Sequence, residues 1–60
     1  MNKEEAIELA KRVIKHGWDF ETFYYGDDMN GREDESDIVW EYVEECREIG
    51  TIAFYDKYGK

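Results

Sequence analysis

The chain has 60 residues and a net charge of −8, which predicts one small acidic domain with little room for an enclosed active site. Its one cysteine excludes an internal disulfide, and its one histidine leaves no Cys and His cluster for zinc. Because the charge repels phosphates, direct binding to nucleic acid or to an anionic membrane surface is not expected.

The first predicted element is an amphipathic helix that follows Asn2 and ends at Gly17. Asn2 is a favourable N-cap residue, and Glu5 stands where a capping box places its second member. Gly17 is typical of a left-handed helix C-cap. Between these signals, apolar residues recur at helical spacing: Ala6, Ile7, Leu9, Ala10, Val13 and Ile14.

The next two segments are predicted to be a strand and a loop. Residues 18–25 are rich in aromatic residues, which alternate with polar ones over the first half of the segment, as is typical of a strand. Residues 26–35 contain Gly26, the Asn30–Gly31 pair and five acidic residues, and this composition indicates a loop.

A second amphipathic helix and a second strand complete the chain. The helix is expected to begin at Asp34 or Ser36 as its cap, to run to about Ile49 and to end at Gly50. Its inward side is predicted to consist of Ile38, Val39, Tyr42, Val43, Cys46 and Ile49. Residues 51–58 are again rich in aromatic and β-branched side chains and are predicted to form a strand.

The predicted fold class is therefore α+β, in the order helix, strand, acidic loop, helix, strand, over one domain of residues 1–60. Both amphipathic helices would cover one face of a small sheet. Aromatic side chains would lie on the other face, where we expect Phe23, Tyr25 and Tyr55. Either the loop 26–35 folds over that face, or another chain covers it, a second copy in a homodimer included.

Negative charge is concentrated in one stretch of the chain. Residues 18–50 contain twelve acidic and two basic residues, a balance of −10, whereas residues 1–17 and 51–60 each balance at +1. The acids of the predicted second helix span about 16 Å at about 1.5 Å per residue, a charge density comparable to the one charge per about 3.4 Å of a DNA strand. Five of them project from one side of that helix: Asp37, Glu41, Glu44, Glu45 and Glu48.

The positions of these charges destabilise the helix that carries them. Like-charged residues lie four apart at 37/41, 41/45 and 44/48, and each such pair destabilises a helix by about 0.2–0.5 kcal/mol. Glu45 and Glu48 also lie near the helix C-terminus, where the helix dipole disfavours negative charge. The pattern favours carboxylates that bind a partner. The alternative is that they form a solvated helix face whose only effect is to keep the protein soluble.

In size and charge the chain resembles the small acidic DNA-mimic proteins of phages and mobile elements, a group that shares a strategy and no motif. The resemblance implies a non-enzymatic inhibitor or regulator that presents a DNA-like surface to a basic nucleic-acid-binding protein. Restriction enzymes, CRISPR effectors, nucleoid proteins and polymerases are targets of this kind, so an anti-restriction or anti-CRISPR role is implied. Five further acids would extend the surface: Asp27, Asp28, Glu33, Asp34 and Glu35.

A second interpretation assigns binding to the aromatic side chains. The chain would then be an adaptor or antitoxin-like module, or a structural homodimer, in which charge only orients the encounter. Its contact residues would be the aromatic side chains of the exposed sheet face and a tryptophan at the edge of the apolar side of the second helix: Phe23, Tyr25, Tyr55 and Trp40.

No other chemistry is expected from the sequence. Cys46 lies on the inward side of its helix, and His16 lies in the last turn of the first helix. Residues 26–37 match a calcium loop only in part, since Gly26 would occupy the first ligand position. We therefore expect no catalytic residue, no cofactor and no metal. Because no signal peptide or transmembrane run is visible, we expect a cytoplasmic protein.

Overall fold

The computed structural model describes residues 1–59. Within this range the α-helices are α1 (Lys3–His16), α2 (Phe20–Tyr24), α3 (Ser36–Ile49) and α4 (Thr51–Tyr58), and 3₁₀ turns at Asp27–Met29 (η1) and Glu33–Glu35 (η2) join α2 to α3. These residues contain no strand, so the predicted α+β fold with a small sheet is wrong. The protein is a small helical domain.

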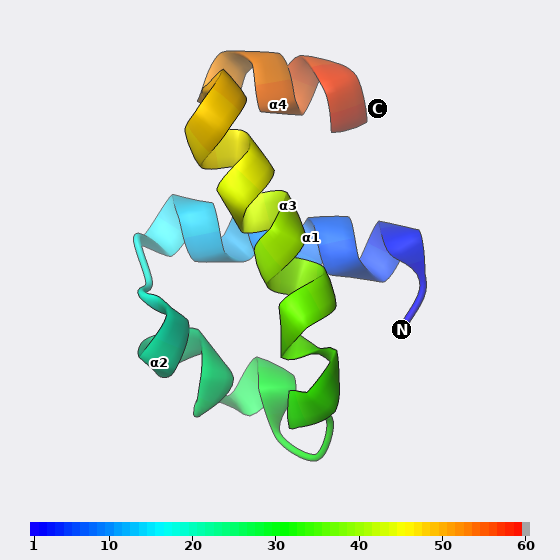
Figure 1. The fold of residues 1–60 in the computed structure, drawn as a ribbon, viewed down its shortest axis with the longest axis vertical. Coiled ribbons are helices and arrows are strands. Elements are labelled where there is room, and N and C mark those ends of the chain that lie inside the picture. The colour runs from blue at the N-terminus through cyan, green and yellow to red at the C-terminus, as the bar shows by residue number, and fades with distance from the viewer. Residues whose placement is uncertain (60) are drawn as a thin grey trace.

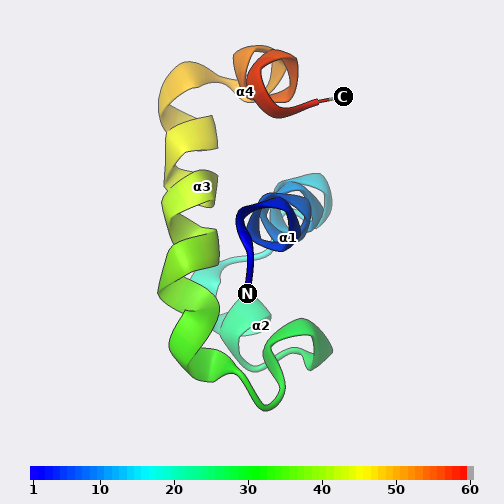
Figure 2. The same ribbon diagram turned by 90° about the vertical axis from the view of Figure 1, so that its right-hand side faces the viewer.

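The helix α3 is the central element of this fold. It crosses α1 in Figure 1, and Figure 2 shows that α1, α2 and α4 all lie on the same side of it. The chain turns sideways after α3, so that α4 lies at one end of α3, while α2 and the 3₁₀ turns lie at the other end. One side of α3 is thus packed, and its other side is left to solvent.

The core fills the space between α3 and the elements on its packed side. It includes Val13 from α1, Phe23 from α2, Met29 from η1, Val43 from α3 and Phe54 from α4, each at most 1% exposed. Every element except η2 therefore supplies a side chain that water does not reach. A chain of this length needs such shared burial, because no pair of its helices could enclose a core alone.

The helix α1 is confirmed by the structure at both of its ends. The Asn2 side chain accepts a hydrogen bond from the backbone N–H of Glu5 at 2.8 Å, and Gly17 adopts a left-handed φ of 68° that ends the helix. The predicted apolar side is buried apart from Ile14, which is half-buried. Cap, periodicity and stop signal agree here, which is why the prediction holds.

The segment predicted as the first strand forms α2 instead. The Asp19 side chain accepts a hydrogen bond from the backbone N–H of Thr22 at 2.7 Å and so caps a new helix. Phe20, Phe23 and Tyr24 have the three- and four-residue spacing of a helix as well as aromatic character. Burial of Phe23 then decides in favour of the helix, because short aromatic runs are compatible with either structure.

Replacement of Asp19 tests in solution whether the segment that follows it is a helix or a strand. We expect Asp19→Ala to lower the melting temperature by several degrees, because the N–H of Thr22 loses its acceptor, whereas Asp19→Asn keeps an equivalent cap and a melting temperature close to wild type. Hydrogen bonds from the side chain and backbone of Thr22 also lower the pKa of Asp19. Thermal unfolding followed by circular dichroism measures the difference, and an unchanged melting temperature in Asp19→Ala contradicts the cap.

The segment predicted as the second strand forms α4. Gly50 has φ 95° and ψ 155°, a combination that is essentially restricted to glycine, and it turns the chain sharply between α3 and α4 within one residue. In the helix, Phe54 is fully buried and Tyr58 packs against it four residues later, with 4.9 Å between the ring centroids. Ile52, which a strand would place beside Phe54, is 83% exposed.

The helix α3 has the predicted extent but not the predicted cap. Its N-cap residue is Glu35, which makes no side-chain capping hydrogen bond, and Ser36 is already helical and buried. Of its predicted inward side, the structure buries Val39, Val43 and Cys46 and half-buries Tyr42, whereas Ile38 and Ile49 are 43% and 40% exposed. The packed arc of α3 is narrower than the apolar stripe of the sequence, because neighbouring helices cover only its centre.

Candidate functional site

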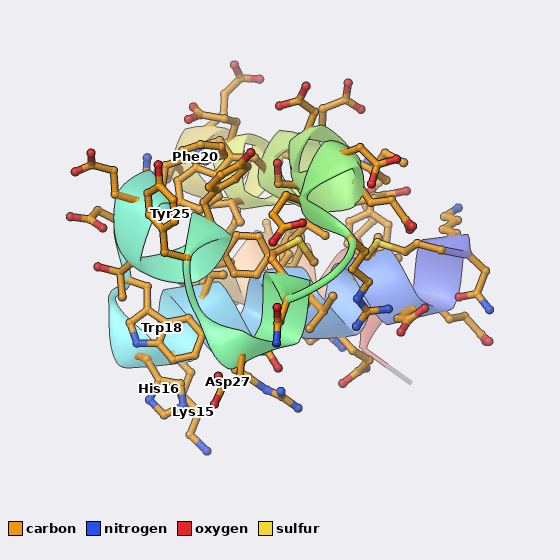
Figure 3. The ribbon with its side chains drawn as sticks, turned by 90° about the horizontal axis from the view of Figure 1, so that it is seen from below. Lys15, His16, Trp18, Phe20, Tyr25 and Asp27 are labelled. Atoms are coloured by element: carbon orange, nitrogen blue, oxygen red, sulfur yellow. The ribbon has the colours of Figure 1, made fainter. Side chains whose placement is uncertain are left out.

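The exposed side of α3 carries a row of carboxylates. Figure 3 shows side chains with carboxylate ends that project from α3 away from α1. Spacings of four, three and four residues place the exposed acids of this row within about 60° around the helix axis. We call this row the acidic stripe; it consists of Asp37, Glu41, Glu44 and Glu48.

The acidic stripe retains most of its charge toward solvent. Within residues 1–59, Glu44 is the one member of the stripe that forms an ion pair, since Arg47 Nη1 lies 3.5 Å from Glu44 Oε2. The same carboxylate oxygen accepts a hydrogen bond from Trp40 Nε1 at 3.1 Å. Four charges over about 16 Å of helix correspond to one charge per about 5 Å, somewhat sparser than one strand of DNA at about 3.4 Å.

Glu45, the fifth acid of the predicted row, points toward α4 instead. Its carboxylate lies 2.6 Å from Lys57 Nζ and accepts a hydrogen bond from the Tyr58 hydroxyl at 2.7 Å. The hydrogen bond from Lys57, and after it the one from Tyr58, lowers the pKa of Glu45 below its ordinary value of 4.5. This contact fastens the end of α4 to α3 and leaves four residues, not five, in the row.

The Glu45 contact makes part of the stability depend on pH. Because the pKa of Glu45 is lower in the folded chain, its stabilising effect is complete above pH 4.5 and is lost as the pH falls through the folded value. We expect Glu45→Gln to be less stable than wild type at pH 7 and equally stable at about pH 2. Urea unfolding at the two pH values measures the gap. Glu41→Gln, at an exposed position, is the control and should show no comparable gap at either pH.

Two of the five acidic residues between α2 and α3 form ion pairs within the fold. Asp28 Oδ1 lies 2.8 Å from Arg12 Nη1, and Arg32 Nη1 lies 2.7 Å from Glu5 Oε2, so α1 and this segment are tied together twice. The hydrogen bond from Arg32 also lowers the pKa of Glu5. A further tie joins Glu35 Oε1 to the amino group of Met1 at 2.8 Å. Asp28 and Glu35 are therefore engaged within the fold.

The remaining acids of this segment are Asp27, Glu33 and Asp34, and of these Asp27 lies away from the acidic stripe. Glu33 Oε2 accepts a long hydrogen bond from the backbone N–H of Gly31, at 3.4 Å. Figure 3 shows Asp27 on the same side of the molecule as His16 and Lys15, away from α3. Asp34 is exposed and lies just before α3 in the chain. Of the predicted extension, Asp27 is thus separated from the acidic stripe, whereas Asp34 directly precedes α3 in the chain.

The predicted aromatic sheet face does not exist, since the described residues contain no sheet. Phe23 is in the core and 1% exposed. Tyr25, 79% exposed, follows α2, whereas Tyr55, 37% exposed, belongs to α4, and these helices lie at different ends of the molecule in Figures 1 and 2. The expectation that these three aromatic residues share one face is therefore wrong, because it assumed the alternation of a strand.

A different group of aromatic rings lies beside the acidic stripe. Trp40 and Phe20 meet edge to face with 5.1 Å between centroids, Phe20 stacks on Tyr24 at 5.5 Å, and Tyr24 meets Tyr25 at 5.0 Å. We call these four residues the ring cluster. Phe20 and Tyr24 were not among the predicted contact residues. The N-cap signal of Asp19 and the helical spacing of Phe20 and Tyr24 could have identified them.

The two residues with reactive side chains lie in different environments. Cys46 is a free thiol buried in the core, whereas His16 is exposed and stacks on Trp18 with 4.8 Å between centroids. Within residues 1–59, no three His, Cys, Asp or Glu side chains come together as metal ligands do. In the same range, no helix has both the length and the apolar character needed to cross a bilayer.

Comparison with family models, with curated proteins and with solved structures gives no match for this chain. Its function is therefore inferred from the geometry and the charge of its own surface.

Proposed function

We propose that this chain is a non-enzymatic inhibitor or regulator that binds a basic nucleic-acid-binding protein and offers it the acidic stripe in place of DNA. The observation that carries the proposal is the row of four exposed carboxylates on a helix whose opposite side is anchored in the core. Because that helix is held by packing, little backbone freedom is lost when the row meets a partner.

The treatment of charge elsewhere in the chain supports this role. Glu5, Asp28 and Glu45 each lie within 2.8 Å of an arginine or lysine nitrogen. Acidic residues that form tertiary contacts are thus paired with a basic side chain. In the acidic stripe, like charges instead face each other at 37/41 and 44/48, at the spacing that destabilises a helix. The contrast favours a role for the stripe outside the folded chain.

A groove that binds DNA is the partner surface that suits this arrangement. Such grooves place lysine and arginine side chains along the phosphate backbone of DNA, and a row of carboxylates can pair with the same lysine and arginine side chains. Screening limits attraction to about 8 Å at physiological salt, so the stripe acts on groups that come into contact with it, while the net charge of −8 speeds the encounter.

We further propose that the chain acts in the cytoplasm. Cys46 is a free thiol, which suits a reducing compartment. Restriction enzymes and CRISPR effectors are nucleic-acid-binding enzymes of the cell interior, so an anti-restriction or anti-CRISPR role of the phage or mobile-element type is consistent with this location.

Competition with DNA tests the proposal. The immobilised chain is used to capture proteins from the heparin-retained fraction of a bacterial lysate, and each captured protein is then loaded with fluorescent duplex DNA. We expect the soluble chain to displace that DNA and both interactions to weaken steeply as salt is raised. A captured protein that holds the chain and the DNA at the same time contradicts the proposal.

A further inference from the structure

The ring cluster and the acidic stripe form one continuous surface along α3. Trp40, Asp37, Glu41 and Glu44 line the same shallow depression on α3. From Trp40 the rings continue through Phe20, which is 36% exposed, toward Tyr25, which is 79% exposed. Figure 3 shows Phe20 and Tyr25 on the α3 side of the molecule, away from Lys15 and His16. A partner that contacts the stripe near Trp40 therefore meets aromatic rings as well.

A cation of the same chain already occupies part of this surface. The guanidinium carbon of Arg47 lies 5.3 Å from the centroid of the Trp40 ring, within the range of a cation–π contact. Arg47 is also 3.5 Å from Glu44, and Glu44 accepts the hydrogen bond of Trp40 Nε1. Ring and carboxylate are thus held together in an arrangement that receives a guanidinium group.

The geometry of this arrangement discriminates between basic side chains. A guanidinium group is planar, so it can stack on an aromatic ring while its N–H groups pair with a carboxylate beside the ring. A lysine ammonium is a strongly hydrated point charge, which gains less from a ring face. The stripe alone would attract either residue, but the stripe next to the ring cluster favours arginine.

We infer that Trp40, Phe20 and Glu44 form an arginine-binding subsite, so that the partner of this chain presents an arginine-rich surface whose central guanidinium replaces Arg47 on the Trp40 ring. This inference rests on the proposed function and names the chemistry of its partner.

Peptides of equal charge test the subsite. Nona-arginine and nona-lysine are titrated into the wild-type chain at one fixed salt concentration, and the ratio of their dissociation constants is measured by calorimetry. We expect wild type to bind nona-arginine about three- to tenfold more tightly, the range of one partly desolvated cation–π contact. Arg47→Met empties the ring face and should increase this ratio, because loss of charge alone strengthens the binding of both peptides equally.

Substitution of the aromatic residues tests whether the preference for nona-arginine depends on their rings. Phe20→Leu and Trp40→Leu should reduce the ratio toward one while nona-lysine binding is kept, and Tyr55→Leu, on α4, is the matched control that should leave the ratio unchanged. Should Trp40→Leu fail to fold, Phe20→Leu decides alone, because its ring is already in part solvent-exposed. A ratio that neither ring variant changes overturns the subsite.

Two outcomes separate the subsite from the proposed function. Equal binding of both peptides by wild type overturns the arginine-binding subsite and leaves the proposed function intact. If neither peptide binds at low salt, the subsite and the proposed function are both overturned, because a surface that mimics DNA must attract a polycation.

Discussion

Neutralising the acidic stripe is expected to weaken binding to a basic, DNA-binding target by about 30- to 1000-fold. Each exposed ion pair at an interface contributes about 0.5–1 kcal/mol and each 1.4 kcal/mol is about tenfold in affinity, so loss of four pairs gives this range. Pairs that become desolvated in the complex would increase the effect. The variant carries Asp37→Asn, Glu41→Gln, Glu44→Gln and Glu48→Gln, and its affinity is measured at one fixed salt concentration against a captured target.

A control variant with the same net charge shows whether position matters. It replaces four exposed acids outside α3 by their amides: Glu4, Glu8, Asp27 and Asp56. Both variants carry four fewer negative charges than the wild-type chain, whose net charge is −8. We expect the control to lose only a few-fold in affinity, mainly through a slower association rate. Equal losses in the two variants would mean that binding depends on total charge and not on the row.

The stripe variant should at the same time be at least as stable as wild type. Its substitutions remove the like-charged pairs 37/41 and 44/48 and leave the buried side of α3 unchanged. Urea unfolding of both proteins measures this. Weaker binding together with equal or greater stability is the signature of residues kept for a partner, whereas a less stable variant would show that the carboxylates serve the helix itself.

The second large effect is expected at Phe54, since Phe54→Ala should leave the chain largely unfolded at 25 °C. Its ring is fully buried at the contact of α4 with the rest of the core. Loss of a buried phenylalanine ring costs about 3–5 kcal/mol. A single core of this size rarely supplies more than about 3–5 kcal/mol of total stability. Circular dichroism should show the loss of helical signal.

Ile52→Ala, in the same helix, is the matched control for Phe54→Ala. Because Ile52 is 83% exposed, its replacement should change the free energy of unfolding by no more than about 0.5 kcal/mol. A strand over 51–58 would place Ile52 and Phe54 on one face and make both substitutions costly. A folded Phe54→Ala variant with an unchanged melting temperature would show that α4 is not docked on the core.

The parts of the fold that could be predicted are those in which several local signals agree. α1 has a cap, an apolar period and a glycine stop, and α3 has a long period and a glycine stop, so their extents were correct. The two short aromatic segments lacked such agreement. Their residues suit a strand or a helix equally, and the choice depends on Phe23 and Phe54 reaching a core formed by residues far away in the chain.

The acidic character of the chain and the position of the α3 acids opposite its apolar residues can be read from the amino-acid order alone, because a helical period is a local property. Which of these acids remain available to a partner depends on how the helices pack. The position of α4 brings Lys57 to Glu45, and the packing of η1 brings Asp28 to Arg12, so those charges are engaged within the fold. Packing of α2 also placed Phe20 beside Trp40, because ring contacts between helices depend on three-dimensional position and not on spacing along the chain.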